Sequence, residues 1–191
     1  MNSYSKDTIK KLGNAMIYIA ERVSDPSKTK LLKLLYLLEE ESVKQNKIPF
    51  FGIPFEVWQA GPVAKDVFID LDIEPRLLSK YISIKHEDNA TYISPKTSFN
   101  DDEFSDNDIA VMEYVIEKFG KKTARQLVVL LHNEGSAWHH VAKENGLLEA
   151  FKRGITNSSD KEIDFTYYLS GCDAEWYREC INFRESIEPL K

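Results

Sequence analysis

The sequence predicts an α+β fold that is predominantly α-helical, a compact helical domain with one or two short β-hairpins. Several segments repeat apolar residues every three or four positions, the period of an amphipathic helix. Two other segments, 50–58 and 81–93, are rich in β-prone residues that partly alternate with polar ones. A length of 191 residues suits one domain with an appended segment. We therefore expect a domain over 1–145 and a helical C-terminal extension over 146–191 that packs on it.

The first two elements are predicted to be helices. Apolar residues recur at helical spacing over 7–23, which indicates one buried stripe. Asp25 and Pro26 are typical of an N-cap and a first helical position, so a second helix is expected over 26–45. Six leucines surround most of that helix, which predicts a buried central element. Its expected solvent-facing strip consists of Lys30, Lys33 and Glu39–Glu41.

The middle of the chain predicts short strands and turns. The aromatic segment 50–58, interrupted by glycine and proline, favours an irregular strand or hairpin. The pair Gly61-Pro62 is expected to form a turn, with Pro62 opening a short helix over 62–72. The segment 81–93 predicts a second hairpin whose turn lies within His86–Ala90.

The C-terminal half carries clear helix-start signals. Ser105 with Asp108, and Thr123 with Gln126, have the spacing of capping boxes. Ser136 is a third N-cap candidate. These signals predict three short helices between 105 and 145, followed by a polar loop and a last helix that contains Trp176 and Phe183.

Composition limits the function classes. The net charge of −6 argues against electrostatic binding of nucleic acid over a broad surface. It does not exclude binding through a local basic face. No apolar run is long enough to span a membrane, and the N-terminal residues contain no signal core. Two cysteines are too few for a disulfide framework. We expect a soluble, cytoplasmic protein with no membrane partner.

Chemical motifs are sparse. His132, His139 and His140 are close in sequence, but their spacing differs from known metal-site patterns. The spacing of Cys172 and Cys180 fits neither a redox motif nor a zinc motif. Glycine-rich phosphate loops are missing. We therefore expect no catalytic, cofactor or metal site, and no enzymatic activity. His132 is instead expected at a helix end, where an imidazole can bond free carbonyls.

Two stretches in a fixed order resemble a known family. The first is Lys30-Leu-Leu-Lys33-Leu-Leu-Tyr36, followed by Trp58-Gln-Ala-Gly61-Pro62-Val63. The second begins with Phe104-Ser-Asp, continues with Phe119-Gly120-Lys-Lys-Thr123-Ala-Arg-Gln-Leu127, and ends with Leu131-His132-Asn-Glu-Gly-Ser-Ala-Trp138. Across 28–140 this order is similar to the Panacea domain, the SocA-like antitoxin or phage-associated GepA-like family. The chain departs from it in having Gly-Ser ahead of Ala137-Trp138, where the family often has a proline just before the tryptophan.

The resemblance implies an antitoxin of a type II toxin–antitoxin pair. Members of the family neutralise a cognate protein toxin, encoded nearby, by direct contact, and in the SocA case the antitoxin resembles an adaptor for a ClpXP-type protease. No cofactor is implied. The candidate partner-binding or motif residues are Lys30, Lys33, Tyr36, Gln59, Gly61, Pro62, Val63, His132 and Trp138.

These motif residues allow two interpretations. They either contact the partner through exposed portions, above all at Lys30, Lys33, Gln59, Gly61-Pro62 and Trp138, or they specify the fold. Because one module meets many unrelated toxins, its recurring residues should mostly hold the scaffold. Specificity would then lie on variable surface, including 146–191. The segment 50–58 offers the same choice between a partner-binding surface and a cover for the leucine-rich helix.

Two functions of other classes stay open. A winged-helix-like DNA-binding regulator could use the short helices with the 81–93 hairpin as a wing, although the negative net charge weighs against it. A hydrolase using His132 or Cys172 is the other.

Overall fold

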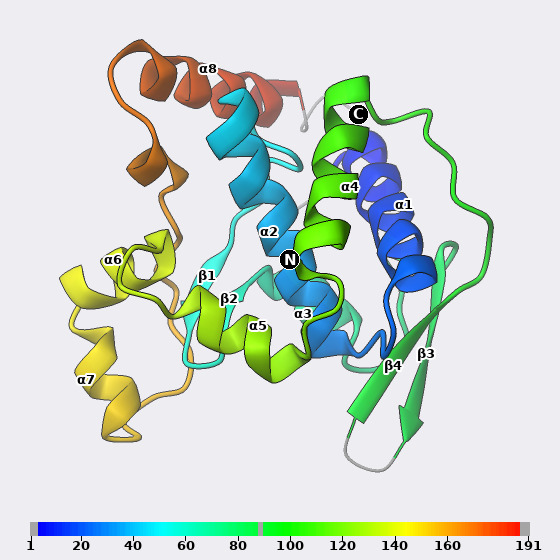
Figure 1. Ribbon diagram of the computed structural model, residues 1–191, viewed down its shortest axis with the longest axis horizontal. Helices are drawn as coiled ribbons and strands as arrows, with labels where there is room; N and C mark the ends of the chain where they lie inside the picture. The colour runs from blue at the N-terminus through cyan, green and yellow to red at the C-terminus, as the bar shows by residue number, and fades with distance from the viewer. Residues whose placement is uncertain (1–3, 88–89, 188–191) are drawn as a thin grey trace.

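The structure is a computed structural model of the chain, and it describes residues 4–87 and 90–187. Helices dominate these residues, and the strands form two separate antiparallel hairpins, so the predicted α+β, mainly helical class is confirmed (Figure 1). In chain order the elements are α1 (Lys6–Arg22), α2 (Lys28–Asn46), β1 (Glu56–Trp58), β2 (Gly61–Val63), α3 (Lys65–Asp70), β3 (Ile82–Glu87), β4 (Ala90–Pro95), α4 (Asp106–Phe119), α5 (Ala124–Leu131), α6 (Ala137–Glu144), α7 (Leu147–Lys152), the 3-10 helix η1 (Phe165–Tyr168) and α8 (Cys172–Ile187).

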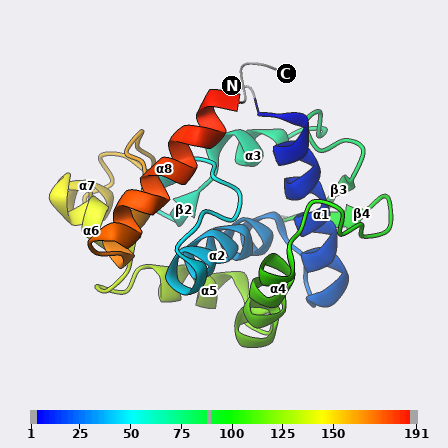
Figure 2. The ribbon, with the colours of Figure 1, turned by 90° about the horizontal axis from the view of Figure 1, so that it is seen from above.

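The leucine-rich helix α2 is the centre of the molecule, as predicted. It contacts α1, α4, α5, β2, β4 and η1, and every residue from 30 to 43 is buried. Figure 1 shows α1 and α4 beside it and α5 crossing below. Seen from above, α8 runs across the end of the molecule at which α2 finishes (Figure 2). A helix that is apolar on nearly all sides needs this cover to remain out of water.

The predicted start of α2 is wrong. Ser27, and not Asp25, is the N-cap residue, and Pro26 lies outside the helix. The O of Pro26 accepts a hydrogen bond from N of Ile93 at 2.9 Å, and Ser27 forms a bridge with Tyr92. The segment therefore extends the edge of β4, a long-range pairing that the local capping signal does not reveal.

The expected solvent-facing strip on α2 is also wrong, because its charged residues are buried. Lys30 and Lys33 are each 2% exposed, and Glu39–Glu41 are buried as well. Nζ of Lys30 donates to O of Ser24 at 2.6 Å. The Glu39 carboxylate accepts hydrogen bonds from backbone N–H groups of the loop after α2. Polar groups are tolerated in a core when they are bonded in this way.

The first hairpin has a different turn from the expected one. Val57 pairs with Pro62 and Trp58 pairs with Gly61, so the turn consists of Gln59 and Ala60. Gly61 and Pro62 are strand residues, and the following helix begins at Lys65. The aromatic segment before β1 is buried and covers α2. Of its two open interpretations, the cover is therefore the one that the structure supports for most side chains.

The second hairpin lies where it was predicted. In β3 and β4 the register pairs Ile82 with Pro95 and Glu87 with Ala90. The hairpin packs against α1. Its expected turn includes Asp88 and Asn89, which lie outside the described residues.

The three capping signals are confirmed. Ser105 and Asp108 form a reciprocal capping box at α4, and Thr123 and Gln126 form another at α5. Oγ of Ser136 accepts from N of His139 at 3.1 Å. Each cap satisfies N–H groups that the first helical turn leaves unpaired.

The segment after α7 contributes to the same core as α2. Phe165 is buried, with its ring centroid 5.6 Å from that of Tyr36 and 6.0 Å from that of Phe55. N of Ile163 donates to O of Phe55, and N of Val57 donates to O of Lys161, each at 2.8 Å. This segment therefore lies along β1 as a short, irregular extra strand.

Candidate functional site around the β1–β2 hairpin

Most residues that the sequence singled out meet at the β1–β2 hairpin. The hairpin itself contains Gln59, Gly61, Pro62 and Val63. Lys33 reaches it from α2, His132 from the end of α5, and Trp138 from α6. The fold thus brings together motif residues that lie about one hundred positions apart in the chain.

Two side chains donate hydrogen bonds to carbonyl oxygens of the hairpin, and a third, His132, has a ring nitrogen within hydrogen-bond distance of another. Nζ of Lys33 donates to O of Pro62 at 2.7 Å, and Nε1 of Trp138 donates to O of Trp58 at 3.0 Å. Nε2 of His132 lies 3.0 Å from O of Gln59. A two-stranded ribbon leaves half of its backbone groups unpaired, and buried carbonyls need partners. Lys33 and Trp138 supply such partners, and His132 contacts the exposed tip of the hairpin, so the three motif side chains hold it in place.

His132 also closes the end of α5, as the sequence predicts. It is the C-cap residue, and its Nδ1 lies 2.5 Å from O of Val128. Its ring contacts the indole of Trp138 edge-on, with centroids 4.0 Å apart. One imidazole therefore links the end of a helix, the hairpin and the tryptophan.

We expect Trp138→Phe to destabilise the protein. The change keeps a buried aromatic ring but removes the N–H that donates to O of Trp58, so the hairpin loses its hydrogen bond to α6. A loss of about 1–2 kcal/mol in the free energy of unfolding follows, measured by chemical denaturation. Trp176→Phe is the matched control, since Trp176 is 55% exposed and exposed substitutions change stability by about 0.5 kcal/mol or less. Equal effects of the two changes would contradict the assigned role.

Gly61 permits the close packing of this site. Its φ is +93°, a conformation that other residues rarely adopt. A Cβ at this position would lie 3.3 Å from Nζ of Lys33 and 3.6 Å from Cε1 of His132. The glycine therefore allows the lysine and the imidazole to approach the same point of the backbone.

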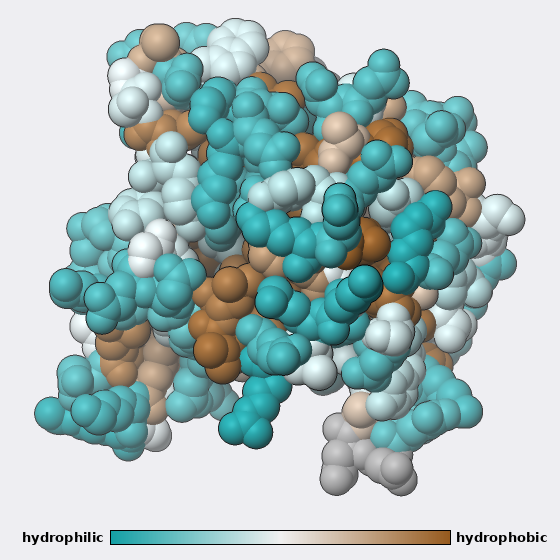
Figure 3. Space-filling view, in the orientation of Figure 1, coloured by the Kyte–Doolittle hydropathy of each residue, from teal (hydrophilic) through white to brown (hydrophobic). Residues whose placement is uncertain are grey.

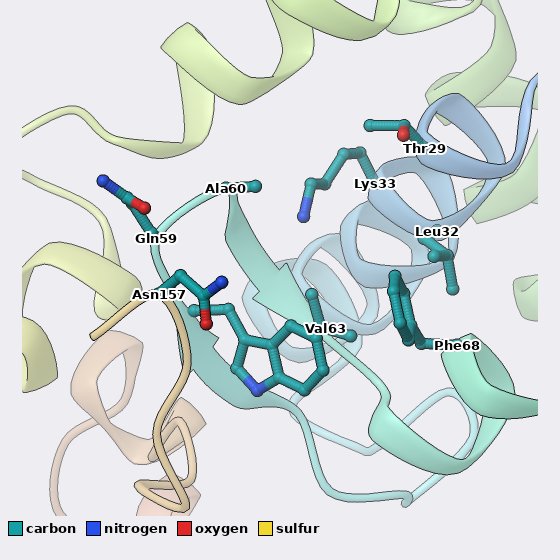
Figure 4. Close-up of a pocket in the computed structure, with 9 residues that line it drawn as sticks. Thr29, Leu32, Lys33, Gln59, Ala60, Val63, Phe68 and Asn157 are labelled. Carbon is teal, nitrogen blue, oxygen red and sulfur yellow. The ribbon is translucent and has the colours of Figure 1, made fainter. Parts of the chain in front are cut away.

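A cavity of about 340 Å³ opens beside the hairpin, and we call it the Lys33 cavity. Figure 4 shows the amino group of Lys33 pointing into it, between Ala60 and Val63. Its mouth lies at the exposed residues Gln59, Ala60 and Asn157. The lining residues are Thr29, Leu32, Lys33, Trp58, Gln59, Ala60, Val63, Phe68 and Asn157.

Burial lowers the pKa of Lys33 to about 7, because desolvation disfavours the charged ammonium. In the unfolded chain the Lys33 amino group has its ordinary pKa of 10.5, so it keeps its proton below that pH. Between these two values the unfolded state binds more protons than the folded state, so stability rises with pH.

We therefore expect the free energy of unfolding of the wild type to rise relative to that of Lys33→Met as the pH increases from 7 to 10. The gain is about 1.4 kcal/mol per pH unit at most. Denaturation curves of both proteins at pH 6.5, 8 and 9.5 measure it. If the free energies of unfolding of the wild type and of Lys33→Met changed with pH in parallel, Lys33 would keep its proton in the folded state over this range, contrary to the prediction.

The structure corrects the expected exposure of the candidate residues. Gln59 is exposed and His132 is half-buried. The buried candidates are Lys30, Lys33, Tyr36, Gly61, Pro62, Val63 and Trp138. Those seven residues lie inside the protein, as residues that specify a scaffold do. Whether any candidate contacts a partner stays a prediction.

Sequence reasoning missed several residues of the site. Phe68 on α3 and Asn157 in the polar loop both line the cavity. N of Gln59 donates to O of Asn157 at 2.9 Å, so this loop is fixed against the hairpin tip. No local pattern relates the loop to a hairpin about one hundred residues earlier, and only the folded chain shows the contact.

The other candidate groups lie apart from this site. His140 stacks on Tyr167, with centroids 4.7 Å apart, and contacts Glu144. Cys172 is exposed and Cys180 is half-buried, both as free thiols.

Within 4–87 and 90–187, no group of three or more His, Cys, Asp or Glu residues could hold a metal ion. Over the same residues, no helix combines the length and the apolar character needed to cross a membrane.

The comparisons with known proteins agree with the sequence resemblance. The family model "Antitoxin SocA-like, Panacea domain" matches residues 31–139, more than half of the 191-residue chain. This region runs from α2 to the start of α6 and contains the β1–β2 hairpin together with Lys33, His132 and Trp138. Searches of curated proteins and of solved structures each found no match. On the strength of the family match, the chain belongs to the SocA-like antitoxin family with a Panacea domain.

Proposed function

We propose that this protein is the antitoxin of a type II toxin–antitoxin pair and neutralises a cognate protein toxin by direct binding. The observation that carries the proposal is the family match over residues 31–139. That match includes most of the central helix and the hairpin with its three side-chain contacts. In this proposal the chain acts by binding and has no catalytic step.

The burial of the motif residues separates scaffold from contact surface. Lys33 and Trp138 bond the hairpin backbone from inside the protein, so they suit a structural role in a module that meets different toxins. The side chains that distinguish one toxin from another are then expected on the exposed surface. Among the described residues, large exposed apolar groups occur on several elements, and Figure 3 shows apolar surface over α5, where Val129 is exposed.

The helix α8 offers the best-defined contact surface. Trp176 is 55% exposed and Phe183 is 67% exposed. They are seven residues apart, which places them two turns apart on one helical face. Exposed aromatic residues are typical anchors of protein interfaces. Because α8 lies outside the matched residues 31–139, it can vary with the toxin while the scaffold stays the same.

Growth rescue tests the proposal. The product of the neighbouring reading frame is expressed alone and together with this chain, and a tagged version of the chain is then purified. We expect the neighbour to stop growth, and the chain to restore it and to copurify with the neighbour. Rescue without a complex, or no toxicity from either neighbour, would contradict the proposal. In the second case, a DNA mobility shift by the chain alone would favour the regulator instead.

A double variant locates the contact surface. We expect Trp176→Ala/Phe183→Ala to weaken toxin binding at least tenfold, with an unchanged far-UV CD spectrum. Ile73→Ala is the matched control, since Ile73 is 76% exposed and lies outside α8. Unchanged binding by the double variant would exclude α8 from the interface.

Two mechanisms of neutralisation can be distinguished by the fate of the toxin. Occlusion requires only the complex, whereas an adaptor role adds a ClpXP-type protease as a second partner. In cells without this protease, occlusion predicts undiminished growth rescue at unchanged toxin levels. An adaptor predicts that the toxin accumulates and that rescue is lost.

A further inference from the structure

The amino group of Lys33 has unused bonding capacity. Below its pKa of about 7 this group is an ammonium with three N–H donors. Among the described residues, Nζ of Lys33 makes one hydrogen bond, to O of Pro62. Its side chain is almost completely buried. In the described part of the chain, no carboxylate lies within ion-pair distance of it, unlike Lys28 with Asp72 at 2.8 Å. A buried cation with free donors is costly unless an anion or polar acceptor reaches it.

The walls of the Lys33 cavity are mostly apolar. Leu32, Val63 and the rings of Trp58 and Phe68 are among the residues that line it. The two rings contact each other with centroids 5.0 Å apart. A volume of about 340 Å³ lies at the lower end of ligand pockets in proteins, which begin near 300 Å³. This space suits one side chain or a molecule of that size.

The nearest acidic side chain in the hairpin is already engaged elsewhere. Glu56 accepts a hydrogen bond from Nε1 of Trp58 at 2.9 Å and lies 3.5 Å from Nζ of Lys65. Glu56 is not among the residues that line the cavity. The cavity therefore presents one cation within apolar walls, which complements a single negative charge attached to an apolar group.

We propose that the Lys33 cavity binds a carboxylate carried on an apolar stem, whose negative charge keeps the Lys33 amino group protonated, and that in the antitoxin complex this group belongs to the toxin. The carboxylate accepts hydrogen bonds from Nζ of Lys33, and the stem contacts Trp58, Val63 and Phe68. The cavity opens at the exposed tip residues Gln59 and Ala60, where a protein partner can insert a side chain or a chain end. Only the source of the carboxylate rests on the proposed function.

Phenylacetate is the probe for the chemistry of the site, with phenylacetamide as the neutral control. Titration into the purified chain is followed by the NMR signals of the Trp58 indole and the Ala60 amide. We expect the chemical shifts of these signals to change saturably with phenylacetate, and phenylacetamide to bind at least tenfold more weakly. Equal responses to both, or no response to the acid, would overturn the proposal.

Three variants assign the response to the cavity. Lys33→Met should abolish phenylacetate binding, whereas Lys30→Met should retain it. Lys30 is an equally buried lysine on the same helix, but it bonds O of Ser24 and does not line the cavity. Ala60→Trp fills the mouth from an exposed position and should also abolish binding, which keeps the test decisive if Lys33→Met fails to fold. Unchanged binding by Ala60→Trp would overturn the proposal.

The toxin complex identifies the source of the carboxylate. Ala60→Trp should weaken toxin binding at least tenfold, and phenylacetate should compete with the toxin for the wild type. If phenylacetate binds but neither effect occurs, the toxin does not occupy the cavity, and that half of the proposal is overturned. If the wild type binds no toxin at all, the proposed antitoxin function fails, while the phenylacetate result still decides the chemistry of the site.

Discussion

Truncation after Gly154 is expected to abolish the cooperative unfolding transition. The missing segment contains Ile163 and Phe165, which are buried in the same core as α2. Its loss exposes the rings of Tyr36 and Phe55 and removes the backbone hydrogen bonds to β1. Each lost buried aromatic group costs about 3–5 kcal/mol, which is a large share of the stability of a typical domain. Thermal unfolding followed by circular dichroism measures the effect.

A second truncation, after Leu169, is the matched control. It removes α8 but keeps Ile163, Phe165 and the pairing with β1. We expect a cooperative transition at a lower temperature, because Tyr177 and its contacts are lost. The division into 1–145 and 146–191 stays a prediction that this pair tests. A cooperative transition in the 1–154 chain would show that the extension is separable from the core.

Glu39→Ala is expected to cost the most stability among single substitutions on α2. The buried Glu39 carboxylate accepts hydrogen bonds from N of Phe50 at 3.2 Å, of Phe51 at 2.7 Å and of Gly52 at 3.3 Å. Alanine leaves all three donors without this acceptor, next to the positive charges of Arg184 and Lys11. The expected loss is about 3 kcal/mol or more in the free energy of unfolding.

Chemical denaturation of Glu39→Ala and Glu39→Gln measures this loss. Glutamine keeps the size of the side chain and one acceptor oxygen, so its cost should be clearly smaller. The carboxylate holds the loop that leads from α2 to β1, and the alanine change should therefore also loosen the hairpin. Wild-type stability of both variants would show that the loop is held by its apolar contacts alone.

Local signals in the sequence predicted most helices correctly. The capping boxes at Ser105 and Thr123 determine where α4 and α5 begin, because the bonds involved join residues three positions apart. The leucines of α2 likewise identify a buried central helix, since no face of it could remain in water. These features depend on neighbours in the chain and can be read without the fold.

Other features depend on distant contacts, and there the predictions failed. Gly61-Pro62 has the composition of a turn, but it pairs with β1, which in turn lies beside the segment that contains Lys161. Lys33 and Glu39 were expected in solvent because charged residues usually are. Their partners, O of Pro62 and the N–H groups after α2, are brought to them only by folding.

The candidate site was predicted in part. The family resemblance selected Lys33, His132 and Trp138, and the structure shows why they occur together, since all three contact one hairpin. The family resemblance did not predict the cavity, because Phe68 and Asn157, which line it, belong to no recognisable sequence pattern. Residues that hold a backbone recur in a family, whereas residues that complete a pocket need only the right shape.

The central claim is that the chain neutralises its toxin by direct binding, and size-exclusion chromatography with light scattering tests it most directly. The purified chain is mixed with the purified product of the neighbouring reading frame. We predict one complex of defined mass, with toxin activity falling in proportion to the amount of complex formed. Separate elution of the two proteins, under conditions in which co-expression restores growth, would contradict the account.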